Sequence, residues 1–119
     1  MISKIESKNK IGVVVSNNVK VLGFLVDLQM KAYREGRKSL LSNLTDDMTR
    51  IFGKNTNSFL SEFKHKIWTL QYKDLIFNIF CSKRGTSIEI CNYDYDQINK
   101  GERESDITEF LEELYNTIK

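Results

Sequence analysis

The amino-acid sequence predicts a single α+β domain over residues 1–119, in which helices pack on an antiparallel sheet. Three consecutive segments between Lys66 and Tyr93 alternate apolar and polar side chains with the period of two that is typical of strands. The C-terminal segment instead repeats apolar residues every three or four positions, as an amphipathic helix does. Together these patterns indicate a sheet followed by a helix that covers it.

The N-terminal part predicts a β-hairpin. Ile11–Val15 is a β-branched run, which favours a strand, and Asn17 and Asn18 suit a turn because Asn tolerates positive φ. We therefore expect a second strand over Val19–Val26. The alternative is a helix from Val19 onward, although Gly23 and the valines disfavour it. That helix would place four residues on one face: Leu22, Leu25, Val26 and Gln29.

The next element is predicted as a helix over Ser39–Phe52, because its apolar residues follow helical spacing. Those residues are Leu41, Leu44, Met48, Ile51 and Phe52. Ser39 is expected to cap the start, and Gly53 stands where a helix C-terminus favours a left-handed residue. Ser58–Phe63 is expected to form one further helical turn that leads into the sheet.

Three antiparallel strands follow, over Ile67–Tyr72, Leu75–Ser82 and Thr86–Tyr93. Two-residue turns at Lys73-Asp74 and Arg84-Gly85 would join them. This register pairs Tyr72 with Leu75 and Cys81 with Ile88, and it places nine residues on one face. They are Trp68, Leu70, Tyr72, Leu75, Phe77, Ile79, Cys81, Ile88 and Ile90, and they predict the main core.

The opposite face of these strands is mostly polar, but it carries an apolar cluster. Ile67 is predicted to lie directly across from Phe80, with Ile76 and Cys91 nearby. A face open to solvent should not carry such a cluster, so a helix of the same chain or another chain must cover it. Ile67, Ile76 and Phe80 are therefore our candidate partner interface, and a dimer or an adaptor surface would use them.

The C-terminal part predicts an exposed loop over Asp94–Glu104 and then a helix over Ser105–Ile118. Ser105 suits the N-cap, and Asp106 and Glu109 suit the positive end of the helix dipole. The apolar stripe of this helix contains Ile107, Phe110, Leu111, Leu114, Tyr115 and Ile118.

Composition indicates a cytoplasmic protein. The net charge of +2 is too small to imply nucleic acid or an anionic membrane by itself. No apolar run approaches the ~18 residues of a membrane helix, and the first residues do not resemble a secretory signal. Cys81 and Cys91 are predicted on opposite faces of the sheet, so we expect no disulfide and a reducing compartment.

No pattern in the chain indicates catalysis, a cofactor or a metal site. The single histidine, His65, is flanked by Lys64 and Lys66 and is expected at the surface. Asp94 and Asp96 begin a stretch that fails the calcium-loop template at the Gly and Glu positions. We therefore expect a protein that is not an enzyme.

A short basic cluster consists of Lys31, Arg34, Arg37 and Lys38, with Glu35 inside it. Such a cluster is usually a solvated face, although it could contact phosphates or an acidic partner. RNA binding is the weaker interpretation, because the aromatic residues that could stack on bases are predicted in the core.

The predicted order β-β-α-β-β-β-α resembles the roadblock and longin modules, in which a five-stranded antiparallel sheet carries a helix after its second strand and another at the C-terminus. The resemblance covers Ile11–Val15 through Ile118 and rests on element order. It implies a non-catalytic scaffold that pairs with itself, with related modules or with small GTPases in trafficking and signalling complexes. It implies no particular site residues, and it depends on a strand at Val19–Val26.

The function that we expect is therefore a cytoplasmic, non-catalytic protein–protein interaction module. The alternative is a small inhibitor or immunity-type protein that blocks one target enzyme by surface complementarity. The small size and the absence of catalytic motifs suit both.

Overall fold

An antiparallel sheet forms one layer of the structure, a computed structural model that describes residues 1–6, 13–14, 19–59, 64–92 and 95–118. Along the sheet the order is β1 (Ser3–Lys4), β4 (His65–Tyr72), β5 (Leu75–Ser82), β6 (Gly85–Ile90) and β2 (Val13–Val14). A short strand, β3 (Asn57–Phe59), pairs with the first residues of β4, on the same edge of β4 where β1 pairs with its last residues. The predicted α+β class with an antiparallel sheet is confirmed.

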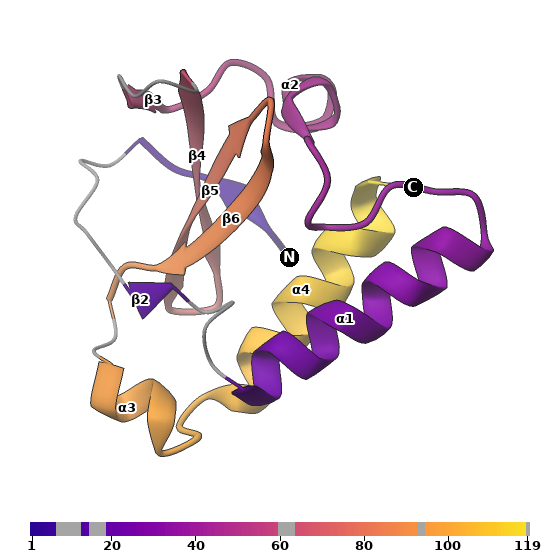
Figure 1. The fold of residues 1–119 in the computed structure, drawn as a ribbon. Helices are drawn as coiled ribbons and strands as arrows, with labels where there is room; N and C mark the ends of the chain where they lie inside the picture. Colours follow the sequence, from indigo (N-terminus) through magenta and orange to yellow (C-terminus); the bar gives the residue numbers. More distant parts are fainter. Residues whose placement is uncertain (7–12, 15–18, 60–63, 93–94, 119) are drawn as a thin grey trace.

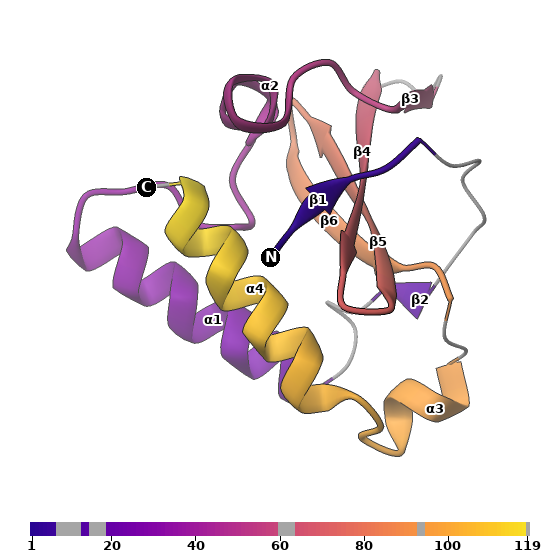
Figure 2. The same ribbon diagram turned by 180° about the vertical axis from the view of Figure 1, so that it is seen from behind.

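The helices within the described ranges are α1 (Val19–Arg34), α2 (Thr45–Phe52), α3 (Tyr95–Asn99) and α4 (Glu104–Ile118). Helices α1 and α4 lie side by side on one side of the sheet, as both ribbon views show (Figures 1 and 2). Helix α2 lies near one end of the sheet, and α3 lies near the opposite end (Figures 1 and 2).

The predicted apolar face of the sheet is confirmed. Tyr72 pairs with Leu75 across the turn at Lys73-Asp74, and all nine residues assigned to the core face are buried. The rings of Phe77 on β5 and Phe110 on α4 are stacked, with centroids 3.8 Å apart and planes within 2°. Helix α4 therefore covers this face, as its apolar stripe predicted.

The register of the second hairpin differs from the prediction by two residues. Ser82 pairs with Gly85, so the turn is Lys83-Arg84, and Ile79 rather than Cys81 faces Ile88. A shift of two keeps every side chain on its predicted face. Gly85, which was assigned to the turn, instead opens β6 with a φ of 135°, and a Cβ there would be 2.6 Å from the carbonyl oxygen of Leu41. Only glycine allows this close approach.

The strand predicted over Val19–Val26 is wrong, because the segment belongs to helix α1. Leu25, Leu28 and Ala32 are buried at helical spacing, and this burial outweighs the strand preference of the valines. Gly23 is exposed and costs the helix little packing. The element order is therefore β-β-α-α-β-β-β-β-α-α, and the order on which the roadblock and longin resemblance was based is not the observed one.

One helix boundary near the middle of the chain also differs from the prediction. Helix α2 begins at Thr45 instead of Ser39, and its N-cap, Leu44, makes no side-chain cap hydrogen bond. The Ser39 hydroxyl instead accepts a hydrogen bond from the Leu41 amide at 3.2 Å, within a loop that docks on β6. Gly53 ends α2 with a φ of 79°, as predicted.

Several other predicted ranges overlap residues that the structure leaves undescribed. Of the strand predicted over Ile11–Val15, the described part is β2. Of the turn predicted over Ser58–Phe63, the described part belongs to β3. The third meander strand ends at Ile90, and the loop expected over Asp94–Glu104 contains the short helix α3.

An ion-pair cluster attaches the β4–β5 turn to the start of α4. The Lys73 ammonium lies 2.8 Å from Asp106 and 2.9 Å from Glu109. Arg103 contacts Asp106 at 2.7 Å and Asp74 at 2.5 Å. Hydrogen bonds from Lys73 and Arg103 lower the pKa of the Asp106 carboxyl to about 2.

We predict that Trp68→Ala lowers the free energy of unfolding by about 3–5 kcal/mol, because Trp68 is fully buried in the core. Its indole also donates a hydrogen bond to the Gly53 carbonyl at 3.0 Å, which joins β4 to the end of α2. Trp68→Phe should lose less, about 1–2 kcal/mol, since most of the ring volume remains. Urea unfolding followed by circular dichroism measures both. A loss below about 1 kcal/mol for Trp68→Ala would contradict the core assignment.

We predict that the free energy of unfolding falls as the pH is lowered from about 4 to about 2. Asp106 has a folded-state pKa of about 2, below its unfolded value, so its stabilisation is present above pH 4 and is lost as the folded carboxyl takes up its proton. Asp106→Asn removes this contribution and should show a shallower acid dependence. Denaturant titrations of both proteins across this pH range provide the measurement, and identical slopes would contradict the role of Asp106.

Candidate functional site

The predicted partner interface on the sheet is largely covered within the chain. Ile67 does pair with Phe80, as expected, but Ile67 is only 4% exposed. Ile76 and Phe80 are half-buried, and the Phe80 ring packs edge-to-face on His65 with centroids 6.2 Å apart. Ile67 and Phe80 are therefore neighbours as predicted, whereas Ile76 lies four residues away along β5, opposite Gln71. Binding at this face stays a prediction.

Two polar residues at the centre of the same sheet face, Thr69 and Asn78, are also buried. The Thr69 hydroxyl donates a hydrogen bond to the Asn78 side-chain oxygen at 2.8 Å. The Asn78 amide nitrogen is buried and makes no hydrogen bond within the described structure. This pair sits between β4 and β5 and belongs to the interior, so it does not extend the candidate interface to the surface.

The largest exposed apolar feature of the described chain lies on helix α1. Leu22 is 42% exposed, Val26 44%, Met30 50% and Tyr33 81%. At about 100° per residue, these four side chains fall within a sector of about 80° around the helix. We call them the α1 outer stripe. They point away from the sector that buries Leu25, Leu28 and Ala32.

Sequence reasoning missed this stripe because it assigned the segment to a strand. The helical alternative placed Leu22, Leu25, Val26 and Gln29 on one face, but the structure divides them. Leu25 is buried against the core, whereas the other three are exposed. The stripe could have been identified from its helical spacing. Successive members are four, four and three residues apart, and they are Leu22, Val26, Met30 and Tyr33.

A shallow hollow of about 320 Å³ continues from the C-terminal half of the stripe. It lies between α1 and the loop that precedes α2, and we call it the α1 hollow. Its lining residues are Gln29, Met30, Tyr33, Arg37, Ser39 and Ser42. Met30, Tyr33 and Arg37 are of residue types that are enriched at protein interfaces.

The basic cluster predicted from sequence borders the stripe and the hollow. Arg37 forms an ion pair with Glu35, and Lys38 lies 3.3 Å from Asp47. The Lys31 ammonium stands 5.8 Å from the centre of the Tyr115 ring on α4. Arg34 is exposed and makes no ion pair with any residue in the described ranges. Positive charge is therefore available at the C-terminal end of α1.

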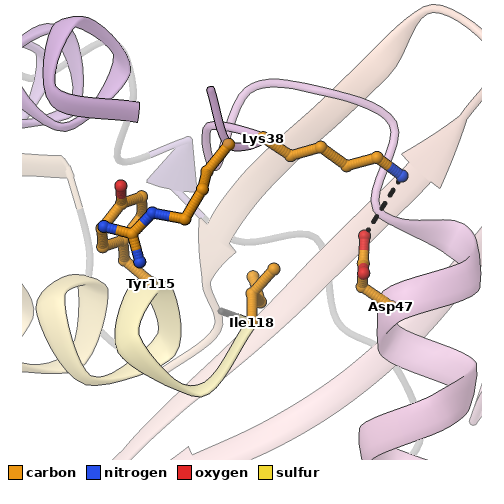
Figure 3. Close-up of a pocket in the computed structure, with 5 residues that line it drawn as sticks. Lys38, Asp47, Tyr115 and Ile118 are labelled. Atoms are coloured by element: carbon orange, nitrogen blue, oxygen red, sulfur yellow. Dashed lines mark hydrogen bonds and ion pairs between the residues drawn. The ribbon is translucent and has the colours of Figure 1, made fainter. Parts of the chain in front are cut away.

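A second, smaller pocket of about 130 Å³ lies beyond Arg37, where the loop before α2 approaches the end of α4 (Figure 3). Lys38, Asp47, Tyr115 and Ile118 line it, together with Arg37. The Arg37 guanidinium lies 5.2 Å from the centre of the Tyr115 ring, a cation–π contact. Both cations already have acidic partners, so we interpret this pocket as the contact that holds the end of α4.

The metal-ligating and nucleophilic side chains of the described ranges form neither a metal cluster nor an activated thiol. No three His, Cys, Asp or Glu side chains gather as a metal site in the described ranges. Of the predicted acidic pair, Asp96 lies in α3, and Asp94 lies outside the described residues. Both cysteines are free, and burial raises the pKa of the Cys81 and Cys91 thiols to about 11, so neither is an activated nucleophile. No helix in the described ranges is long and apolar enough to cross a membrane.

Comparisons with protein-family models, with curated proteins and with solved structures found no match to this chain. The site is therefore argued from the chain itself. Its strongest feature is the α1 outer stripe with the adjoining hollow.

Proposed function

We propose that this chain is a non-catalytic protein-binding module, and that the α1 outer stripe is its contact surface. The observation that carries the proposal is the exposure of Leu22, Val26, Met30 and Tyr33 on one side of a helix whose other side is buried. Single exposed apolar residues are common on protein surfaces, but a contiguous row of large ones marks an interaction site.

The residue types support a protein partner. Methionine, tyrosine and arginine are enriched at interfaces, and all three adjoin the α1 hollow. Full burial of an exposed Leu, Val or Met side chain contributes about 1.5–3 kcal/mol. The stripe residues of these types are already about half covered, so each would contribute roughly half of that amount on binding.

The proposal includes a reducing, cytoplasmic setting, which two free cysteines in a fold without a described disulfide support. The chemistry of the described residues, which lacks an activated nucleophile and a metal cluster, favours binding over catalysis.

We predict that a photo-reactive phenylalanine analogue placed at Met30 forms a discrete protein adduct in extract from the source organism. A second probe at Phe80 tests the rival face of the sheet, and a third at exposed Glu112 on α4 is the background control. The adduct at Met30 should disappear when Val26→Asp is added, since a charge on the stripe prevents its burial. Gel mobility and mass spectrometry identify the adducts.

The matched control for Val26→Asp is Asn116→Asp, which adds the same charge at an exposed position of α4. Both substitutions should leave the free energy of unfolding within about 0.5 kcal/mol of the starting protein. An adduct at Phe80 alone would move the contact surface to the sheet. No adduct above the Glu112 background, or one that survives Val26→Asp, would overturn the proposal.

A further inference from the structure

The α1 outer stripe has the length and shape of a helix-binding surface. From Leu22 to Tyr33 it extends about 17 Å at about 1.5 Å per residue, which is three helical turns. A partner helix lying along it would present its own apolar residues at spacings of three and four. This inference about the partner rests on the proposed function.

The α1 hollow supplies a position for one anchoring side chain of such a helix. Its volume of about 320 Å³ lies between α1 and the loop at Ser39 and Ser42. This space is far larger than the roughly 30 Å³ of a water molecule, so an apolar side chain can enter it. Side chains that fill a desolvated pocket carry much of the binding energy in interfaces.

The charges beside the stripe select the partner's polar residues. Lys31 and Arg34 lie on one flank of α1; the Lys31 ammonium stands 5.8 Å from the Tyr115 ring of α4, and Arg34 has no acidic partner in the described structure. Asp27 is the one acidic residue of α1, and at about 100° per residue it lies on the same flank, four residues before Lys31. We propose that the stripe binds an amphipathic helix of another protein whose edge carries acidic residues opposite Lys31 and Arg34.

A second copy of the chain fits this surface less well. An antiparallel pair that overlays the two stripes sets Leu22 level with Tyr33 and Val26 level with Gln29, one residue from Met30. The same register places the two Asp27 carboxylates within about one turn of each other on the same flank, and it places Lys31 of each copy equally close to the Asp27 of the other. It also sets Arg34 level with Val21, so this cation stays unpaired. A parallel pair sets Arg34 of one copy level with Arg34 of the other, which places two like charges side by side.

An anionic membrane surface also fits less well. An interfacial helix binds with an apolar face flanked by cations and lies on a broad surface. The stripe instead adjoins a concave hollow lined by Ser39, Ser42 and Gln29, which a bilayer surface cannot fill. Asp27 would also face the anionic headgroups.

Three labelled helical peptides test the proposal against the full chain. All carry the same leucine stripe over five turns, and their flanks are glutamate, glutamine or lysine. Fluorescence anisotropy should show at least about tenfold tighter binding of the glutamate peptide than of the glutamine peptide at low salt. The difference should shrink in about 0.5 M salt, because exposed charge pairs are screened.

The charge-reversal variant Lys31→Glu/Arg34→Glu should invert the preference, so that the lysine peptide binds best. The matched control Lys66→Glu/Lys83→Glu makes the same change in charge at exposed positions of the sheet and should retain the glutamate preference. Met30→Ser should weaken binding of every peptide.

Equal binding of the three peptides, a lysine preference in the unmodified chain, or no binding of any peptide would overturn the acidic helix. Stripe-dependent binding to phosphatidylserine vesicles would assign a membrane instead, and a Val26→Asp-sensitive dimer in sedimentation would assign a second copy. These results are separate from the photo-adduct at Met30, which decides whether the stripe binds any protein.

Discussion

The contact between Phe77 and Phe110 joins the two layers of this protein, and the rest of the structure depends on it. The stacked rings, with centroids 3.8 Å apart, place α4 across the apolar face of β4, β5 and β6. Two further contacts hold α4 at its ends: the ion pairs of Lys73 and Arg103 with Asp106 at the start, and the Arg37–Tyr115 contact at the end. Helix α1 then lies beside a helix that is fixed along its whole length.

The position of α1 explains why it carries two apolar faces. Leu25, Leu28 and Ala32 fill the core beside α4, and this burial is sufficient to hold the helix. The outer stripe is only partly covered, so it contributes less to that packing, and the exposed parts of Met30 and Tyr33 gain no free energy of burial. Apolar side chains that stay this exposed, and that form a contiguous row, are best explained by a surface that is covered in a complex.

The sheet could be predicted from sequence because strand alternation and tight turns are local constraints. The face that runs from Trp68 to Ile90 and the turn at Lys73-Asp74 follow from them. The second turn was misplaced, because Gly85, which was assigned to it, instead opens β6 close to the Leu41 carbonyl. A shift of two residues leaves the pattern of faces unchanged, so alternation alone cannot detect it.

The candidate site was harder to predict than the fold. Val19–Val26 has the composition of a strand, and only the burial of Leu25, Leu28 and Ala32 by tertiary packing makes it a helix. The apolar pair Ile67 and Phe80 was located correctly, but sequence could not show that Ile67 is covered by its own chain. The position of Lys31 and Arg34 beside the stripe could be recognised only once α1 was known to be a helix.

The most direct test of this account is the solvent exposure of individual methyl groups on α1 in the isolated chain. A soluble gadolinium chelate broadens the NMR signals of methyl groups that it can approach. We expect strong attenuation for Leu22, Val26 and Met30, and little for Leu25, Leu28 and Ala32. Protection of the first set to the same degree as the second would show that the stripe is buried within the chain, and it would contradict the account.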